Sequence, residues 1–391
     1  MKFTLCLAVQ VSLSLARVLN AGLHSTAQRS GPANVNVPLT DWMRGDIDLQ
    51  WHGTIEVGTP PRCKYQPTYQ VLCNVMFDTG STGVLLPRSN CATCGPSKSA
   101  TFSQQPATPM NIQFGTGGDT IPLSAPQGAN CTVVTDAVSI AGLTSPKQEF
   151  KLCDVYAATL ASQPADGILG LGSSNPSNWD NINTFQPLLF GLFNNSQIPN
   201  PIFSLSYVPG QKNGSELTLG GTNPSRYDRG GLATMVVRLD GPLSEATQSW
   251  VVDVSAVYIG GQPLRNSSNS NQPLSPSVAL LDSDTAYILM PDLQTTRDLY
   301  AQPIDNLGSW GASCKTLDSA ARDVTISLGN EGGQMVNVTV PEKFFNLGEY
   351  PGKRGVCQAV FLNPPNPARE PFQRRSAWVL GSPLLKNYYT I

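Results

Sequence analysis

Two aspartates lie in matching local patterns 204 residues apart (282 − 78). Asp78 lies in the segment VMFDTGS (75–81), and Asp282 lies in the segment ALLDSDT (279–285). In each segment an apolar run ends at the acid, and hydroxyl residues occupy the first and third positions after it. Two carboxyl groups held in contact cannot both ionise cheaply, so one keeps its proton and the pair supplies both a base and an acid. The repeat predicts an acid–base dyad to which two related halves of the chain each contribute one carboxyl group.

The small residues that follow the two acids are expected to support this dyad. Thr79 and Ser283 can brace the two turns against each other through their hydroxyl groups. Ser81 and Thr285 can hydrogen-bond the acids, and Gly80 permits a tight turn. The alternative is that both acids only cap turns of the chain.

The second position after the acid breaks the repeat, because Asp284 stands where the first turn has Gly80. If this backbone position needs a positive φ, aspartate tolerates it at a cost of about 1 kcal/mol. A third carboxylate near the dyad would also disfavour ionisation, by about 1 to 4 kcal/mol at 4 Å depending on screening. The side chain could instead point away from the dyad, or clash with a substrate. Asp284 therefore leaves two hypotheses: a working dyad with raised pKa values, or an impaired second turn.

The elements that must position these acids have the pattern of an all-β protein. From Trp51 onward, short alternating apolar runs are broken by Gly, Pro, Asn and Ser, which is typical of closely spaced strands. One convincing helix is expected from Phe185 to Phe193, and another after Pro291. Each acid is followed by a second apolar-glycine segment, GILGLG (167–172) in the first half and WVLG (378–381) in the second. The same order in both halves predicts a duplication, with a cleft between two lobes.

The N-terminus and the composition indicate an exported protein. Residues 1–16 have a basic start, an apolar run and a small-residue cleavage site, which predicts a signal peptide, and the polar residues 17–45 are expected to be a short pro-segment. No later stretch is apolar enough to span a bilayer, so we expect a secreted, extracellular protein with no membrane partner. Charged residues are only 13% of the chain and the net charge is −2, so nucleic acid is not an expected partner. Glycosylation sequons begin at Asn130, Asn194, Asn213, Asn266 and Asn337.

The cysteines also fit an oxidising compartment. Nine are present, and Cys6 leaves with the signal peptide, so eight remain and suggest four disulfides. The pair Cys91 and Cys94 could instead be redox-active or half of a zinc site. No second CxxC motif exists, however, and His24 and His52 are the only histidines, so we expect no metal and no cofactor.

From about Trp51 to Ile391 the chain resembles the pepsin-like aspartic proteases, in the manner of a fungal-type secreted member with a variant second catalytic turn. The segments that carry the resemblance occur in the family's order. They are GTI (53–55), GTP (58–60), FDTGS (77–81), GTG (115–117), DGILG (166–170), LGG (219–221), DS (282–283), WVLG (378–381) and YYT (388–390).

The resemblance implies a bilobal, double-psi β-barrel fold with an active-site cleft between two homologous lobes. The N-terminal lobe would comprise residues 46–225 with Asp78 and a mobile flap, and the C-terminal lobe residues 226–391 with Asp282. The family normally continues past its Tyr-Tyr-Thr segment with at least one more strand, so the second lobe is expected to be truncated at its end. A monomer is expected, because the duplication already supplies both halves of the site.

The implied activity is that of a secreted aspartic endopeptidase. A water molecule activated between Asp78 and Asp282 would hydrolyse peptide bonds of a polypeptide substrate at acidic pH. The family usually holds its zymogen shut with a pro-segment lysine, and residues 17–45 contain none. The alternative is a catalytically impaired pepsin-like protein, peptide-binding or a decoy, because Asp284 replaces the glycine of the second motif.

The resemblance also assigns a flap and a disulfide. Phe114, Gly115 and Thr116 fall at the flap tip, where the family usually has Tyr in place of Phe114, bonded to a Trp at the position of Leu85. Replacement of both members by apolar residues suggests a coherent apolar variant of the substrate-binding site. Cys314 and Cys357 match a disulfide of the family's second lobe. Cys63 and Cys73 lie in an insertion and are a candidate pair, Cys91–Cys94 and Cys131–Cys153 remain by elimination, and the pairing of these six stays open.

Overall fold

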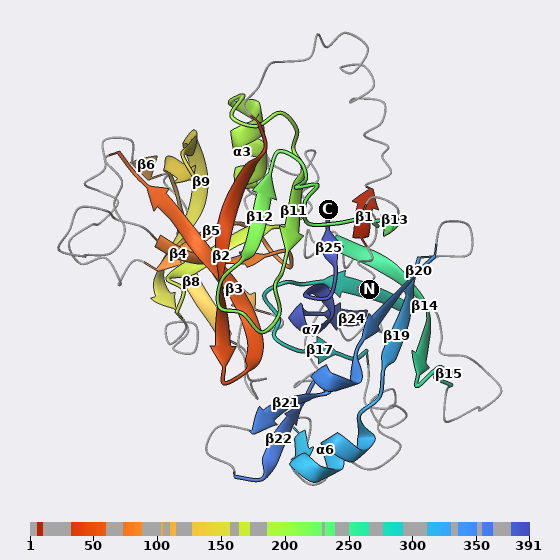
Figure 1. The fold of residues 1–391 in the computed structure, drawn as a ribbon. Coiled ribbons are helices and arrows are strands. Elements are labelled where there is room, and N and C mark those ends of the chain that lie inside the picture. Colours follow the sequence, from red (N-terminus) through yellow and green to blue (C-terminus); the bar gives the residue numbers. More distant parts are fainter. Residues whose placement is uncertain are drawn as a thin grey trace.

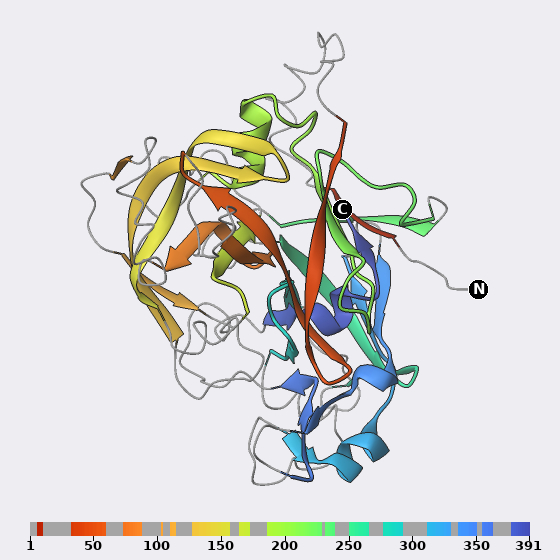
Figure 2. The same ribbon diagram turned by 60° about the vertical axis from the view of Figure 1, so that its left-hand side comes forward.

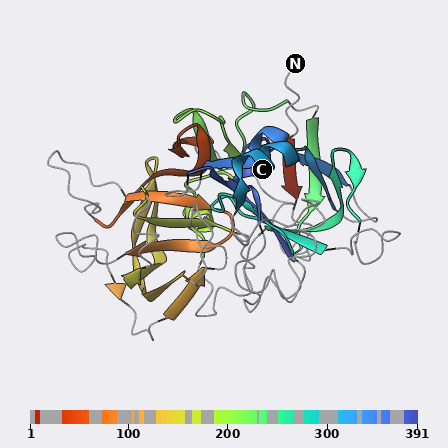
Figure 3. The same cartoon turned by 90° about the horizontal axis from the view of Figure 1, so that it is seen from below.

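Strands form most of the described chain. The computed structural model describes residues 6–10, 33–59, 73–87, 103–104, 110–114, 127–156, 164–172, 186–228, 231–238, 250–265, 277–291, 311–329, 335–349, 354–362 and 377–391. Strand-rich halves lie side by side, with the orange and yellow elements in one and the cyan and blue elements in the other (Figures 1 and 3). The expected all-β, bilobal architecture is confirmed.

The largest sheet of the described residues has 14 strands and includes segments from both ends of the chain. In sheet order these are β13 (Leu232–Val236), β1 (Cys6–Gln10), β25 (Tyr389–Thr390), β11 (Phe203–Ser206), β12 (Ser215–Leu219), β2 (Val35–Arg44), β3 (Ile47–Val57), β4 (Cys73–Asp78), β10 (Gly167–Leu171), β5 (Thr82–Pro87), β9 (Leu143–Tyr156), β8 (Gln127–Ile140) and β6 (Ser103–Gln104), with β7 (Met110–Phe114) paired to β8.

The second half contains an 8-stranded and a 3-stranded sheet. The former comprises β20 (Val336–Val340), β19 (Val324–Leu328), β14 (Trp250–Ile259), β16 (Ser277–Leu281), β24 (Ala377–Leu380), β17 (Ile288–Leu289) and β23 (Phe361–Leu362), with β15 (Gln262–Pro263) beside β14. The latter comprises β18 (Gly311–Ser313), β22 (Val356–Ala359) and β21 (Asn346–Glu349). The helices of the described ranges are α3 (Leu188–Asn194), α6 (Cys314–Ala320), α7 (Ser382–Leu385) and the 3₁₀ helix η5 (Glu342–Phe344).

The two halves repeat one strand order. The path β3-β4-β10-β5-β9 in the first half corresponds to β14-β16-β24-β17-β23 in the second. In each half, the strand formed by the second apolar-glycine segment is β10 or β24. This strand runs parallel to the strand that leads to the acid and antiparallel to the strand that follows the acid turn. Strands β5, β10 and β24 are buried along their whole lengths, which explains why their sequences are mostly apolar. The duplication predicted from the two acid segments is therefore present in the topology.

Two hydrophobic clusters fill the halves. One contains buried residues between Val37 and Leu219, and the other contains residues between Met235 and Leu385 together with Leu49. The proposed lobe boundary after residue 225 lies between these two ranges. Leu49 belongs to the second cluster because its strand crosses from one half to the other.

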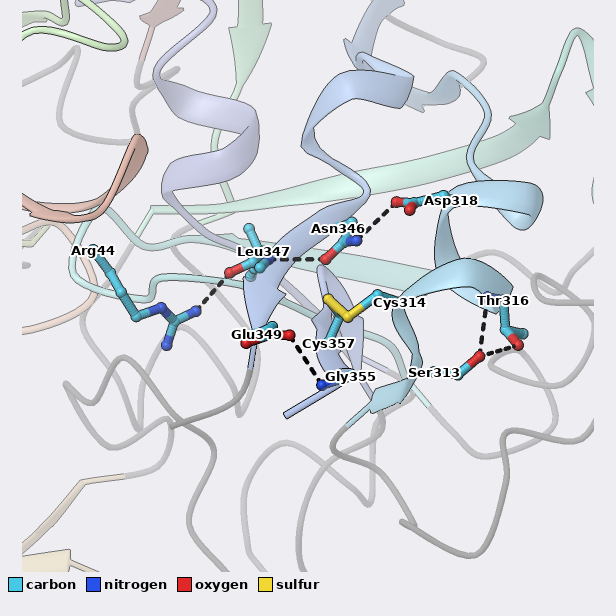
Figure 4. Close-up of a disulfide and its surroundings, with 11 residues drawn as sticks. Arg44, Ser313, Cys314, Thr316, Asp318, Asn346, Leu347, Glu349, Gly355 and Cys357 are labelled. Carbon is cyan, nitrogen blue, oxygen red and sulfur yellow. Dashed lines mark hydrogen bonds between the residues drawn. A yellow bond between two sulfur atoms is a disulfide. The ribbon is translucent and has the colours of Figure 1, made fainter. Parts of the chain in front are cut away.

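This crossing is made by the β2–β3 hairpin, which extends from the yellow strands to the blue elements (Figure 2). At its turn, Arg44 donates a 2.7 Å hydrogen bond to the carbonyl oxygen of Leu347, close to the Cys314–Cys357 disulfide (Figure 4). On β3, the Asp48 carboxylate accepts a 3.0 Å bond from Lys386, and both side chains are almost fully buried. The hairpin thus fastens the first half to the second.

Several sequence expectations can be compared with these elements. The helix expected over 185–193 is α3, which starts after Pro187, and Leu188, Leu189 and Leu192 are buried in it. Strand β2 falls within the expected pro-segment, and Val37 and Leu39 lie in the core. Strand β1 falls within the expected signal peptide and pairs with β13 and β25. The helix expected after Pro291 lies in residues outside the described ranges.

Two disulfides are present among the described residues, Cys131–Cys153 and Cys314–Cys357. The first is the pair expected by elimination, and the second is the pair implied by the family resemblance. Cys73 is also disulfide-bonded, whereas Cys63, Cys91 and Cys94 lie outside the described residues. Within the described ranges, no helix has both the length and the apolar character needed to cross a membrane.

Candidate active site

The first acid lies at the end of β4, where the parallel strand β10 approaches. Asp78 is paired in register with Gly170 and is only 6% exposed. Its Oδ1 accepts a 2.6 Å hydrogen bond from the backbone N–H of Gly80, and its Oδ2 accepts a hydrogen bond from the Ser81 hydroxyl. The turn after β4 therefore supplies one donor to each carboxyl oxygen.

The second acid repeats this arrangement directly after β16. Asp282 is 3% exposed, and its Oδ1 accepts a 3.1 Å hydrogen bond from the backbone N–H of Asp284. Its Oδ2 accepts a 2.8 Å bond from the Thr285 hydroxyl. The two turns thus use the same backbone and hydroxyl positions, and the side chain of residue 284 is not needed for the bond to the acid.

The two turns are joined by four reciprocal hydrogen bonds. The N–H of Thr79 donates to Ser283 Oγ at 3.0 Å, and the N–H of Ser283 donates to Thr79 Oγ1 at 2.9 Å. Thr79 Oγ1 in turn donates to the Leu281 carbonyl at 2.8 Å, and Ser283 Oγ donates to the Phe77 carbonyl at 2.6 Å. All four bonds are buried, so the strands that carry the acids are fixed relative to each other.

The close approach of the halves explains Gly80. A β-carbon at this position would lie 2.6 Å from Cγ of Asp282 and 2.8 Å from both of its carboxyl oxygens. Neither Gly80 nor Asp284 has a positive φ, so the concern about a left-handed backbone at residue 284 does not apply. Glycine is required in the first turn because the second acid occupies the adjacent space.

The electrostatics favour one retained proton. Burial raises the pKa of Asp78 well above its ordinary value, and the charge of the adjacent Asp282 raises it further. The hydrogen bonds from Ser81 and the N–H of Gly80 act in the opposite direction, and a hydrogen bond between the two acids again favours the protonated form. The pair can therefore hold one carboxyl and one carboxylate side by side, which is the state needed for combined acid and base chemistry.

The side chain of Asp284 is buried and contacts a residue of the first half. It is 6% exposed, and its Oδ1 lies 3.2 Å from Nε2 of Gln50, which also donates to the Asp284 carbonyl oxygen. Gln50 comes from β3 of the first half and could not be predicted as a site residue, because no local pattern connects residues 50 and 284. Tyr207 is a second residue near the acid turns that the sequence does not indicate. The centroid of its ring lies 4.3 Å from that of Trp51. Burial raises the pKa of Tyr207, and a hydrogen bond with Ser283 opposes that shift.

The expected flap residues are only partly described. Phe114 is the last residue of β7, nothing is described of its side chain, and Gly115 and Thr116 lie outside the described residues. Leu85 is buried on β5 in a small cluster with Ile168, against which Ile112 of β7 packs. Leu85 therefore lies in the interior next to the strand that leads to the expected flap.

The other predictions from the sequence concern glycosylation sites and metal binding. Exposed side chains are found at four sequon positions, Asn130, Asn194, Asn213 and Asn337, and Asn266 lies outside the described residues. In the described part of the chain, no group of three or more His, Cys, Asp or Glu side chains is arranged to hold a metal ion.

Comparison with known proteins identifies the family. The family model for eukaryotic aspartyl proteases matches residues 50–391. Rhizopuspepsin-3 from Rhizopus niveus is 27% identical over 308 residues, which cover 75% of this chain and 67% of that protein. Pepsin-2B from Gadus morhua is 25% identical with coverages of 90% and 95%, and cathepsin E from Mus musculus is 27% identical with coverages of 92% and 80%. With both acid turns inside the matched region and the duplicated strand order on both sides of them, the chain belongs to the eukaryotic aspartyl protease family of pepsin-like endopeptidases.

Proposed function

We propose that this protein is a secreted endopeptidase that hydrolyses polypeptides at acidic pH with Asp78 and Asp282. The observation that carries the proposal is the symmetric, buried pair of acid turns, in which each acid has two donors and the turns are cross-linked by Thr79 and Ser283. The Asp284 side chain, which bonds Gln50, is compatible with this arrangement.

In the proposed reaction, the carboxylate of the dyad accepts a proton from a water molecule as its oxygen attacks the peptide carbonyl carbon. The protonated carboxyl donates its proton to the carbonyl oxygen, which gives a tetrahedral intermediate. Collapse of this intermediate breaks the C–N bond. One acid of the dyad donates its proton to the leaving nitrogen, and the other accepts a proton from a hydroxyl group of the intermediate, which becomes the product carboxylic acid. The dyad returns to one proton, so the reaction consumes only water.

Processing and export belong to the same proposal. Residues 1–16 would be removed as a signal peptide, which takes β1 away and leaves the edges of β13 and β25 that it covers without this partner. Glycans could attach to the exposed sequons. Because β2 is paired on both sides and contributes Val37 and Leu39 to the core, we propose that any activating cleavage falls before Val35, not at residue 45. The mature protein would be an extracellular monomer with a polypeptide substrate held between the lobes under the segment that follows Phe114.

The proposal is tested by hydrolysis of haemoglobin or casein between pH 2 and 6. The natural protein is expected to cleave, and Asp78→Asn and Asp282→Asn should each lose at least about 100-fold in rate, the lower range for a positioned acid or base. Circular dichroism establishes that the variants are folded. Equal cleavage by either asparagine variant, or no cleavage by the folded natural protein at any pH, would refute the proposal.

A second candidate function is peptide binding without hydrolysis. It is favoured by the third buried acid, Asp284, in the turn that holds Asp282. The variant Asp284→Gly distinguishes the two functions. If the natural protein is inert and this variant cleaves, the protein is a peptide-binding relative of the proteases.

A further inference from the structure

Gln50 is a buried glutamine of the first half that contacts the second acid turn. We propose that Gln50 is a positioning residue, which holds the backbone and carboxyl group of Asp284 on the side of the β2–β3 hairpin and so makes an acid tolerable at this position. The inference deepens the proposed function and rests on it, since it concerns the turn of Asp282.

Both donors of one side-chain amide serve this contact. The Gln50 side chain is fully buried, and its Nε2 donates to the carbonyl oxygen of Asp284 and, at 3.2 Å, to its Oδ1. A primary amide has two N–H bonds, so it can serve two acceptors at once. The backbone N–H of Asp284 donates to Oδ1 of Asp282 at 3.1 Å. Residue 284 thus links the dyad on one side to Gln50 on the other.

Gln50 is itself held by a closed ring of contacts. The Ser382 hydroxyl at the start of α7 donates a 2.8 Å bond to the Leu49 carbonyl, and the Ser382 N–H donates a 2.8 Å bond to the Thr285 carbonyl. Residues 49 and 50 of β3 and residues 284 and 285 of the turn are therefore joined twice, once through Ser382 and once through the Gln50 amide. This ring fixes the position from which the amide acts.

The charges around the contact explain why an amide is suitable. Asp78 and Asp282 face the turn from the dyad, and two positions before Gln50 on β3 lies Asp48, ion-paired with Lys386. A carboxyl group at position 50 would add another acid to this buried group and would compete for protons. The neutral amide donates to Asp284 without adding charge.

A double-mutant cycle tests the inference, with Gln50→Met to remove the donors at similar size and Asp284→Gly to remove the carboxyl group. In the natural background, Gln50→Met is expected to lower kcat/KM for a peptide substrate about 10-fold, mainly through kcat. In the Asp284→Gly background the loss should be smaller by about 5-fold, because the carboxyl group that needs positioning is gone. Any shift of the high-pH limb of activity caused by Gln50→Met should occur only when residue 284 is aspartate.

Gln148→Met is the matched control. Gln148 is also buried, and its amide donates to two backbone carbonyls, of Glu149 and Gln186, on β9 and before α3. Its replacement should change kcat/KM equally in both backgrounds and leave the pH profile unmoved. Equal losses for Gln50→Met with aspartate and with glycine at position 284 would overturn the inference and leave Gln50 with a structural role only.

The result of this double-mutant cycle can be distinguished from a failure of the proposed function. If the natural protein cleaves nothing, the proposed function fails, and the same cycle is then measured by thermal unfolding. Gln50→Met should lower the melting temperature by about 2 to 4 °C more with Asp284 than with glycine at this position. No coupling between positions 50 and 284 in unfolding would reject the contact itself.

Discussion

The cross-link between the acid turns predicts a large effect of one hydroxyl group. Thr79→Val keeps the shape of the side chain but removes Oγ1, which accepts from the Ser283 N–H and donates to the Leu281 carbonyl. Both groups are in a buried setting, where each polar group that loses its partner costs about 1 to 3 kcal/mol. The two losses together predict a decrease in the free energy of unfolding of about 2 to 6 kcal/mol.

The assay is urea unfolding of the natural protein and the variant, followed by tryptophan fluorescence. Thr79→Ser is the control, since it keeps the hydroxyl and removes one methyl group, worth about 0.8 kcal/mol. Ser283→Ala removes the symmetric hydroxyl and should cost about as much as Thr79→Val. A Thr79→Val variant that unfolds within about 0.5 kcal/mol of the natural protein, the range of an ordinary surface substitution, would refute the reasoning about the cross-link.

Three further predictions concern the buried charges of the β2–β3 hairpin and the disulfide of the second half. Lys386→Met should decrease the free energy of unfolding by about 3 to 5 kcal/mol, because it leaves the Asp48 carboxylate buried without its cation. Adding Asp48→Asn should restore part of this loss in urea unfolding, and the absence of any restoration would contradict a stabilising ion pair. Burial, reinforced by the neighbouring Asp48, raises the pKa of Asp41 to about 8. Because the folded-state pKa is raised, the contribution of Asp41 to the free energy of unfolding is fully present below the unfolded pKa of about 4 and is lost as pH rises towards 8. Asp41→Asn should therefore flatten the decline of stability over this pH window, and an unchanged slope would contradict the assignment. Replacing Cys314 and Cys357 by serine removes a disulfide that closes a loop of 43 residues. This should decrease the free energy of unfolding by about 4 kcal/mol and lower the melting temperature. An unchanged melting temperature would show that the disulfide does not restrict the unfolded chain.

The sequence was sufficient for the parts of the site that repeat locally. The acid segments around Asp78 and Asp282 predict the two turns, because the apolar run, the acid and the hydroxyl positions are all local features. The second apolar-glycine segments predict the strands that complete each half, since β10 and β24 take the same place in both strand orders. The hydroxyl groups of Thr79 and Ser283 make the predicted cross-link.

Features that depend on contacts between distant segments could not be predicted in this way. Gln50 and Asp284 are 234 residues apart, and nothing near either residue indicates the other. Strand β2 was included in a pro-segment because residues 35–44 look irregular on their own, and its place follows only from pairing with β12 and β3. The reason for Gly80 is likewise the approach of Asp282 from the other half, not the turn itself.

The central claim is that Asp78 and Asp282 act on one substrate as a single dyad. Calorimetric titration with a pepstatin-type inhibitor, which presents a hydroxyl group where the tetrahedral intermediate would form, tests it most directly. We predict one binding site per chain, with binding strongly weakened by Asp78→Asn and by Asp282→Asn alike. The absence of binding to the folded natural protein, or binding that depends on only one of the two acids, would contradict the claim.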